Sequence, residues 1–354
     1  MKKMKSIRKL RVGVIGLGMG GAHAVNYKKH PGVELVALAD LDEVRLKKRA
    51  GEFGVSACYT DAGDMLAKEG LDLVSIATPN ALHKPLTFQA LKAGCHVLCE
   101  KPMAMNAGEA REMIKAAKQA KRRLMINFST RFNPAAWAMK KEVDSGNVGD
   151  IYFSRTVWLR RRGMPGFGGW FGQKKLAGGG PLIDLGVHRL DLALWLMGYP
   201  KPVWVMGSTY DHLASAIAKE QGKSFDVEDF AAAMIRFENG ATLELEASWA
   251  GHIRSGELME TRVLGTKGGM LHTHFDETKP YEWGLEIYND RNGFQTTSRV
   301  GQGLAPVPTA MSHLVDCILE DKPHMATGEE GLVVQELLDA IYASAAKGKP
   351  IQLG

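Results

Sequence analysis

The sequence contains little cysteine. Its 354 residues include only four, namely Cys58, Cys95, Cys99 and Cys317, and no two of them form a CxxC pair. This pattern excludes a small disulfide-stapled secreted domain and offers no cysteine-based zinc site. We therefore expect buried thiols in a reducing compartment, which predicts a cytoplasmic protein.

Long hydrophobic runs are also missing. No stretch approaches the roughly 20 apolar residues that a membrane span needs, and the first apolar run, Val12–Ile15, stops at Gly16, too early for a signal peptide. We expect no membrane partner. The net charge is +6, but much of the excess lies in the first eleven residues and around Lys115–Arg123. Because such segments are usually solvated faces, we expect no nucleic-acid partner.

The histidines do not form a metal-binding pattern. His272 and His274 stand two residues apart, on one side of a possible strand, but no carboxylate or cysteine follows at ligand spacing. We expect no metal.

The sequence does contain a regular alternation of strand-like and helix-like segments up to residue 127. The predicted strands are Val12–Ile15, Glu34–Ala39, Leu71–Ala77, His96–Glu100 and Arg123–Phe128, and the predicted helices are Ala22–His30, Glu43–Phe53, Pro85–Ala93 and Ala107–Lys121. Alternation of this kind is typical of βαβ units and a parallel sheet. The fold class is therefore α/β, with a Rossmann-type doubly wound domain over residues 1–127.

Beyond about residue 130, strand-like segments crowd together. They are Ile151–Trp158, Val203–Ser208, Asp229–Phe237, Ala241–Ser248 and Thr261–Leu264. The turn Glu238-Asn239-Gly240 indicates a hairpin, and two helical stretches, Pro181–Met197 and Met311–Lys347, can cover one face. We predict a second α/β domain over residues 128–354 with an open, largely antiparallel sheet, and a C-terminal helix (311–347) that packs back toward the first domain.

A glycine-rich turn directly follows the first strand. Gly16, Gly18 and Gly21 have the GxGxxG spacing, with Met19 inside the loop. In dinucleotide-binding folds the first glycine makes the tight turn, the second lets the backbone approach the pyrophosphate, and the third allows close helix–strand packing. Asp40 ends the next strand, where a carboxylate accepts hydrogen bonds from the adenosine ribose.

That carboxylate would also repel a 2′-phosphate. We therefore predict NAD as the cofactor and place NADP second, because the nearby Arg45 and Lys47 still permit NADP.

Two later strands end in polar residues. Ligands of open α/β sheets bind at the carboxyl ends of the strands, so we expect cofactor contacts from Thr78, Asn80 and His83 after one strand and from Glu100 and Lys101 after the next.

A largely apolar helix carries a polar stripe. Asp184, His188 and Asp191 are spaced i, i+4, i+7 and so share one helical face. The triple glycine 178–180 just upstream favours a ligand that approaches the backbone. The alternative is a core histidine bonded to Asp184.

Together these motifs resemble the Gfo/Idh/MocA oxidoreductases, from about Arg11 to Leu353. The resemblance implies a Rossmann domain followed by an α/β domain whose open sheet mediates assembly into a homodimer or homotetramer. It also implies that Lys101, Asp184 and His188 are the catalytic and substrate-binding residues.

The chemistry of these residues suits alcohol oxidation. Imidazole titrates near neutral pH, so His188 is the expected general base for the hydroxyl proton. Lys101 would stabilise the developing alkoxide and keep the histidine neutral, while Asp184 would orient a neighbouring hydroxyl. The lysine remains an alternative proton acceptor.

The family handles sugars, inositols and glycosides, so the resemblance implies a carbohydrate-like substrate. Aromatic rings stack on sugars and arginine binds hydroxyls or carboxylates. Candidate substrate residues are Trp158, Arg160, Arg162 and Trp170, with Asn127 and Arg131 as weaker ones.

We expect an NAD-dependent dehydrogenase acting on a secondary alcohol. Two alternatives stay open: redox-neutral chemistry such as NAD-assisted glycoside cleavage or epimerisation, and a non-catalytic sensor on the same fold. The first uses similar residues, so only the lack of net NADH would distinguish it from a dehydrogenase, and the presence of the lysine, aspartate and histidine counts against the second.

Overall fold

A computed structural model describes residues 8–276, 282–300 and 303–354, so most of the basic N-terminal segment lies outside the described residues. The chain divides into two compact units. The first contains the residues up to Asn127 together with Pro308–Leu332, and the second contains Phe128–Val307 and Val333–Gly354.

The first unit is built on a parallel sheet with the order β3-β2-β1-β4-β5-β6 over the described residues. Its strands are β1 (Leu10–Ile15), β2 (Val33–Ala39), β3 (Ala57–Tyr59), β4 (Leu73–Ile76), β5 (His96–Cys99) and β6 (Leu124–Ile126). Its helices up to residue 127 are α1 (Gly20–Lys29), α2 (Glu43–Phe53), α3 (Ala62–Lys68), α4 (His83–Lys92) and α5 (Ala107–Ala120), with a 3₁₀ turn at Asn80–Leu82. This order reverses between β1 and β4, which is the switch point where a Rossmann fold binds its dinucleotide.

Local signals explain where these helices begin and end. The Asp42 side chain accepts hydrogen bonds from the backbone N–H groups of Val44 and Arg45 and so caps α2, which ends at Gly54 in the left-handed conformation. Asn106 caps α5 in the same way. The sequence predicted these two helices but not α3 or the three-residue strand β3, which are too short to show a clear periodicity.

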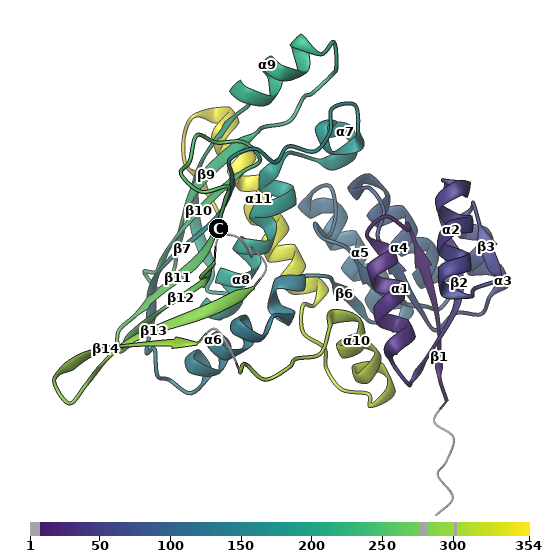
Figure 1. The fold of residues 1–354 in the computed structure, drawn as a ribbon, viewed down its shortest axis with the longest axis horizontal. Helices are drawn as coiled ribbons and strands as arrows, with labels where there is room; N and C mark the ends of the chain where they lie inside the picture. The colour runs from purple at the N-terminus through teal and green to yellow at the C-terminus, as the bar shows by residue number, and fades with distance from the viewer. Residues whose placement is uncertain (1–7, 277–281, 301–302) are drawn as a thin grey trace, which may run out of the picture. The chain divides into compact units, whose positions relative to one another are not determined.

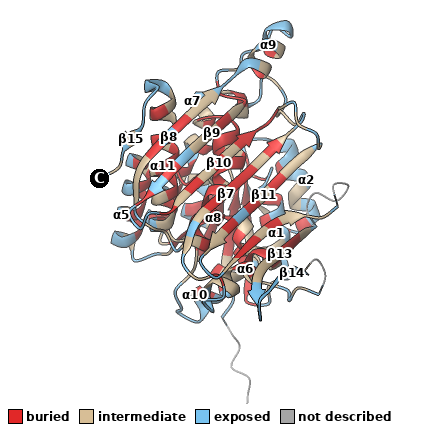
Figure 2. Ribbon diagram, turned by 90° about the vertical axis from the view of Figure 1, so that its left-hand side faces the viewer, coloured by how far each residue is buried: buried red, intermediate tan, exposed pale blue. Residues whose placement is uncertain are grey.

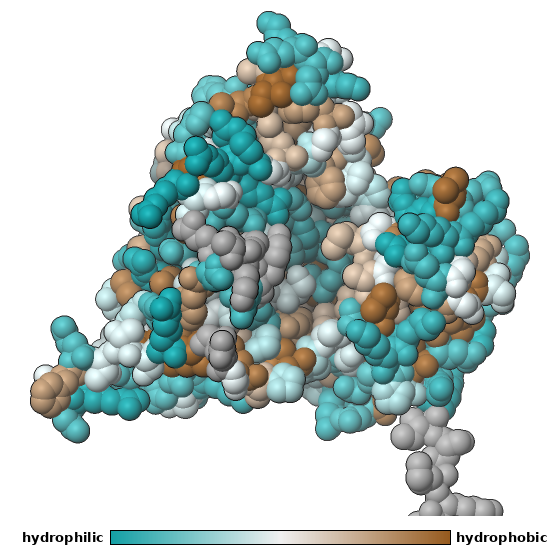
Figure 3. Space-filling view, viewed as in Figure 1, coloured by the Kyte–Doolittle hydropathy of each residue, from teal (hydrophilic) through white to brown (hydrophobic). Residues whose placement is uncertain are grey.

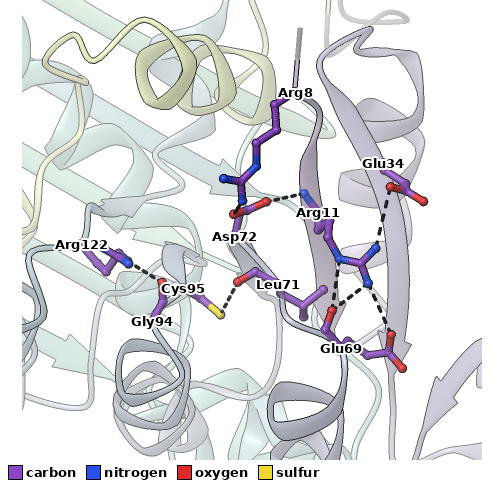
Figure 4. A network of polar contacts seen from close by, with 9 residues as sticks. All are labelled: Arg8, Arg11, Glu34, Glu69, Leu71, Asp72, Gly94, Cys95 and Arg122. Carbon is purple, nitrogen blue, oxygen red and sulfur yellow. Dashed lines mark hydrogen bonds and ion pairs between the residues drawn. The ribbon is translucent and has the colours of Figure 1, made fainter. Parts of the chain in front are cut away.

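A polar network fixes the amino-terminal edge of this sheet (Figure 4). The Asp72 carboxylate accepts hydrogen bonds from the Arg11 backbone N–H at 2.9 Å and from the Arg8 guanidinium at 2.6 Å, and Arg11 also donates to the Glu69 carbonyl oxygen at 2.8 Å. These bonds join the start of β1 to the turn before β4. Because the strands are parallel, their loops for ligand binding lie at the opposite edge.

The first unit is not continuous in sequence. Its β6 pairs with a later segment, since Met125 bridges Thr327 and the Ile126 backbone N–H donates to the Ala326 carbonyl oxygen at 2.9 Å. Helix α10 (Ala310–Leu319) packs against α1. The sequence-based domain boundary at 127 therefore leaves out residues 308–332, which the structure assigns to the first unit.

The helical stretch predicted at Met311–Lys347 is two helices, α10 and α11 (Gly328–Lys347). Asp321 has a positive φ and Pro323 follows it, and neither suits a helix interior. A capping box then starts α11: the Glu330 N–H donates to the Thr327 hydroxyl, and the Thr327 N–H donates to the Glu330 carboxylate at 2.8 Å. Periodicity alone did not show this break.

The second unit contains a larger, mostly antiparallel sheet, with the order β14-β13-β12-β11-β7-β10-β9-β8-β15 over the described residues. Its strands are β7 (Ile151–Arg160), β8 (Pro202–Tyr210), β9 (Phe230–Phe237), β10 (Thr242–Ser248), β11 (Glu257–Gly265), β12 (Gly268–His274), β13 (Trp283–Arg291), β14 (Phe294–Val300) and β15 (Ile351–Gln352). The predicted hairpin joins β9 to β10, with Gly240 in the left-handed conformation. Strands β7 and β10 form the parallel pair within this sheet.

Helices cover one face of this sheet (Figure 1). They are α6 (Pro134–Asp144), α8 (Val187–Met197) and the later part of α11, and the remaining helices are α7 (Lys174–Ala177) and α9 (His212–Glu220), with 3₁₀ turns at Ser129–Phe132 and Trp170–Gly172. Buried and partly exposed residues alternate along the strands (Figure 2), as expected for a sheet with one packed face. Strand β7 of this sheet and helix α8 carry residues of the candidate site described below.

The segment before α8 differs from the regular helix predicted over Pro181–Met197. Residues Leu182–Gly186 form a π-helical turn, and α-helical geometry begins only at Val187. Asp184 therefore lies within the π-helical turn, whereas Asp191 lies within α8.

Candidate functional site

The glycine loop after β1 has room for a phosphate group. Gly16 has φ of +85°, and a Cβ atom there would lie 2.4 Å from the Ala77 carbonyl oxygen, so this position requires glycine. A Cβ on Gly18 would meet nothing within 4 Å. The backbone at Gly18 is thus open where a pyrophosphate would approach the start of α1.

Gly20, and not Gly21 as the sequence suggested, makes the close helix–strand contact. Gly20 is the residue that packs on the sheet, because a Cβ there would lie 2.8 Å from the Val14 side chain. A Cβ on Gly21 would instead lie 3.1 Å from the Arg49 guanidinium of α2. The third glycine of the fingerprint therefore makes room for an arginine, and Gly20 provides the close helix–strand contact.

Asp40 is held at the carboxyl end of β2. Its Oδ2 accepts a hydrogen bond from the Leu17 backbone N–H at 2.7 Å and one from Arg45 at 3.3 Å. Apolar side chains beside these loops are exposed, with Leu41 at 82% and Met19 at 66%. On the face drawn in Figure 3, apolar groups of the first unit stand out against a largely hydrophilic surface, and an exposed apolar side chain beside a polar loop suits an adenine ring.

A buried polar cluster surrounds the carboxylate of Glu100, the residue before Lys101. Glu100 Oε1 is 2.9 Å from His23 Nε2 and accepts a hydrogen bond from Asn127 Nδ2 at 2.6 Å, while His23 Nδ1 is 2.6 Å from the Ser75 hydroxyl. Burial opposes the charge of Glu100, but the hydrogen bonds from His23 and Asn127 prevail and lower its pKa to about 2. His23 was not found from the sequence, where it was one residue of an ordinary helix.

Two predicted site residues have partners within the protein. Asn127, expected to contact substrate, uses its amide nitrogen on Glu100. His83, expected to contact cofactor, is fully buried, and its ring nitrogens lie 2.8 Å from the Pro102 carbonyl oxygen and 3.1 Å from that of Thr78. Burial lowers the pKa of His83. His83 is the first residue of α4. Its contacts with the carbonyl oxygens of Thr78 and Pro102 join the loop after β4 to the loop after β5.

Lys101 and Asn80 follow β5 and β4 at the carboxyl edge, as predicted. The Lys101 backbone N–H donates to the Glu100 carboxylate at 3.2 Å, and the Lys101–Pro102 peptide bond is cis.

In the second unit, Asp184 and His188 lie among aromatic residues. Trp249 Nε1 donates to Asp184 Oδ2 at 3.0 Å, and the ring centroids of Trp158 and His188 are 5.8 Å apart. Trp170 stacks on Phe171, which contacts Trp249 edge-on. Sequence reasoning found Trp158 and Trp170 but missed Trp249, whose only signal was an aromatic residue after a strand.

Trp158 and Arg160 are fixed by a carboxylate on the neighbouring strand. Glu257 Oε1 accepts hydrogen bonds from Trp158 Nε1 at 2.6 Å and from Arg160 Nε at 2.7 Å. Arg162 is exposed and donates to the Arg161 carbonyl oxygen at 2.6 Å. The tryptophan is thus set in place beside His188, and Arg160 uses its Nε–H on the same carboxylate oxygen.

Arg131, predicted as a weaker substrate residue, has a structural role. It is fully buried, and its guanidinium donates to Asp191 at 2.9 and 2.6 Å and to the Tyr199 hydroxyl. A buried ion pair of this kind is costly to break. The ion pair joins the 3₁₀ turn before α6 to helix α8. It also gives Asp191, the third residue of the predicted polar stripe, a partner within the protein.

The triple glycine has a packing role. A Cβ on Gly179 would lie 1.9 Å from the Tyr342 hydroxyl, and one on Gly180 would lie 2.0 Å from the Glu228 carbonyl oxygen. Gly178 ends α7 in the left-handed conformation. Glu228, absent from the sequence predictions, is buried here, and burial raises its pKa.

The predicted site residues thus fall into two groups. The first unit brings together the residues at the carboxyl edge of the parallel sheet: Gly16, Gly18, Met19, Gly21, Asp40, Thr78, Asn80, Glu100 and Lys101. The second unit holds Asp184 and His188 beside Trp158. The structure also describes no helix long and apolar enough to cross a membrane and, within the same residues, no cluster of three potential metal ligands.

Comparison with known proteins explains this arrangement. Residues 10–128 match an oxidoreductase family with an NAD-binding Rossmann fold, and residues 137–271 match the GFO/IDH/MocA C-terminal domain. The chain belongs to the Gfo/Idh/MocA family. The protein is an NAD-binding oxidoreductase, and the open glycine loop and Asp40 fit that cofactor.

Individual family members are similar over the whole chain. The D-glucoside 3-dehydrogenase of Escherichia coli is 34% identical over 100% of both chains, and the levoglucosan dehydrogenase of Pseudarthrobacter phenanthrenivorans is 30% identical over 96% of this chain and 97% of its own. A levoglucosan dehydrogenase solved with NADH and L-sorbose is 26% identical, has a TM-score of 0.85, and is matched over 98% of this chain and 99% of its own.

Proposed function

We propose that this protein oxidises a secondary hydroxyl group of a sugar, polyol or glycoside. The observation that carries the proposal is the group in the second unit, where Asp184 is held by Trp249 and His188 lies beside Trp158. A carboxylate and an imidazole among aromatic rings suit a ligand with hydroxyl groups and apolar ring faces. The relatives named above as glucoside and levoglucosan dehydrogenases support this substrate class.

In this proposal the chain's own residues handle the proton and the charge. His188 removes the hydroxyl proton, Lys101 donates a hydrogen bond to the same oxygen as negative charge develops, and Asp184 orients a neighbouring hydroxyl. Bound NAD supplies the hydride acceptor. Gly16, Gly18 and Met19 would hold the pyrophosphate of NAD, and Asp40 would hold its ribose.

Purified protein incubated with NAD and a panel of sugars, polyols and glycosides tests the proposal by absorbance of reduced nicotinamide. NADH formation from members of the panel is the expected result. NAD binding without NADH from any substrate would contradict net oxidation, and chromatography of the products would then separate redox-neutral cleavage or epimerisation from a sensor that converts nothing.

Replacing Asp40 with alanine is expected to weaken NAD binding by about 10- to 100-fold, because charge-assisted hydrogen bonds contribute about 1.5–3 kcal/mol. Binding of NADP should improve relative to NAD, since the repulsion of its 2′-phosphate is gone. Titration of both dinucleotides measures the ratio. Asp42→Asn is the matched control, because asparagine also caps a helix well; an unchanged ratio in Asp40→Ala would contradict the assignment.

We also propose that the outer face of the large sheet joins copies of this chain. Met206 and Met234 are exposed and lie opposite each other on β8 and β9, with the exposed Tyr210 further along β8. Exposed apolar residues on adjacent strands favour an interface. Light scattering should show a homodimer or homotetramer that Met206→Lys weakens; a monomeric wild type would contradict this.

The four cysteines are free thiols, which supports a cytoplasmic location.

A further inference from the structure

Glu228 lies two residues before β9 and contacts a segment far from it in sequence. Its Oε2 accepts a hydrogen bond from the Gly180 backbone N–H at 2.8 Å, and its Oε1 accepts one from the Leu182 N–H at 3.1 Å and one from the Tyr342 hydroxyl at 2.8 Å. The residue is 7% exposed. A buried carboxylate therefore binds the N–H groups at the start of the helix that carries Asp184 and His188.

The fit around this carboxylate is close. Glycine at 179 and 180 lets the segment lie directly against Tyr342 and against the backbone of Glu228, since any side chain at either position would collide with them. The glycines, the carboxylate and the tyrosine thus form one packed contact within the second unit.

The segment held in this way has an unusual conformation. Leu182–Gly186 is a π-helical turn, in which the Val187 N–H donates to the Leu182 carbonyl oxygen. Single π-helical turns are rare and less favourable than α-helix, and they often occur at functional sites. Asp184 lies inside the turn and His188 just beyond it, so the relative placement of the two side chains depends on the π geometry.

We infer that Glu228, supported by Tyr342, is a positioning residue that keeps this π turn in place and so sets Asp184 with respect to His188. The inference rests on the proposed function of these two residues. The negative charge at the start of the helix is favourable because the free N–H groups there carry partial positive charge. Glu228 acts through the helix and not on the substrate.

Replacing Glu228 with glutamine tests the inference, because the amide has the same shape but lacks the charge. We expect kcat to fall by about 30-fold, as misplaced reacting groups slow the chemical step. The KM for NAD should stay unchanged, because the cofactor residues belong to the first unit. Tyr342→Phe leaves the carboxylate on both N–H groups and should lower kcat less.

Asp229→Asn is the matched control. Asp229 is the adjacent buried carboxylate and likewise accepts hydrogen bonds from helix N–H groups, those of Leu213 and Ala214 at 2.7 Å, but α9 carries no predicted site residue. If Glu228 only stabilises the fold, both variants should lower the melting temperature and neither should change kcat in the folded protein. A fall in kcat in Glu228→Gln but not in Asp229→Asn supports positioning, and equal kcat in both overturns it.

Amide hydrogen exchange over residues 178–190 gives a readout that does not need a substrate. Glu228→Gln should exchange faster in this segment than the wild type and than Asp229→Asn, because the turn loses its support. Unchanged exchange would overturn the inference, whereas a wild type that forms no NADH would contradict the proposed function alone.

Discussion

Replacing Lys101 with methionine is expected to lower kcat/KM for sugar oxidation by about 10³-fold, because a charged donor to developing alkoxide contributes on that scale. Lys101 follows Glu100 at the carboxyl edge of the parallel sheet, and the buried Glu100 carboxylate accepts a hydrogen bond from its backbone N–H. The backbone contact remains in the variant, so the loss should come from the missing ammonium group. NAD affinity should fall by less than about tenfold, the range of one hydrogen bond.

Steady-state kinetics with NAD and an identified substrate, and a separate NAD titration, measure the two effects. Lys84→Met is the matched control, since Lys84 lies in the same unit but forms a partly exposed ion pair with Glu112 at 2.7 Å. Activity near the wild-type level in Lys101→Met would remove the lysine from the mechanism. His188→Asn provides the companion test for the proposed base, with a loss of similar size expected.

Replacing Glu100 with glutamine is expected to lower the free energy of unfolding by about 3 kcal/mol at pH 7. The pKa of Glu100 is lowered from 4.5 to about 2 in the folded protein, so its charged form is favoured by folding. That contribution is fully present above pH 4.5 and is lost as the pH falls toward 2. The difference between wild type and variant should therefore shrink as the solution becomes acidic.

Urea unfolding of both proteins at pH 7, 4.5 and 3 follows this difference. Glu112→Gln removes a carboxylate from a partly exposed ion pair and should cost no more than about 1 kcal/mol. A gap between Glu100→Gln and wild type that stays constant down to pH 3 would show that the loss arises from packing and not from the charge.

The sequence predicted those parts of the site that depend on local patterns. The glycine loop, Asp40 and Lys101 follow strands whose apolar runs are visible in the sequence, and a parallel sheet brings the ends of its strands to one edge. Asp184 and His188 were likewise visible as polar residues on an apolar helix.

What could not be predicted depends on partners distant in the chain. Glu228 binds backbone groups 46 and 48 residues away, and no spacing rule indicates such a contact. The same holds for the pairing of Arg131 with Asp191, which turned a predicted ligand residue into a structural one. Buried polar groups need partners, but the sequence alone does not reveal which ones tertiary packing will supply.

The later segment that pairs with β6 has a consequence for how the protein is made. A ribosome completes residues 128–307 before it reaches Ala326 and Thr327, so the first 127 residues cannot complete their unit until residues 308–332 are synthesised. A fragment that stops at residue 127 would leave the β6 edge unpaired and the side of α1 that contacts α10 bare. An exposed strand edge recruits other chains, so such a fragment would aggregate unless residues 308–332 were supplied with it.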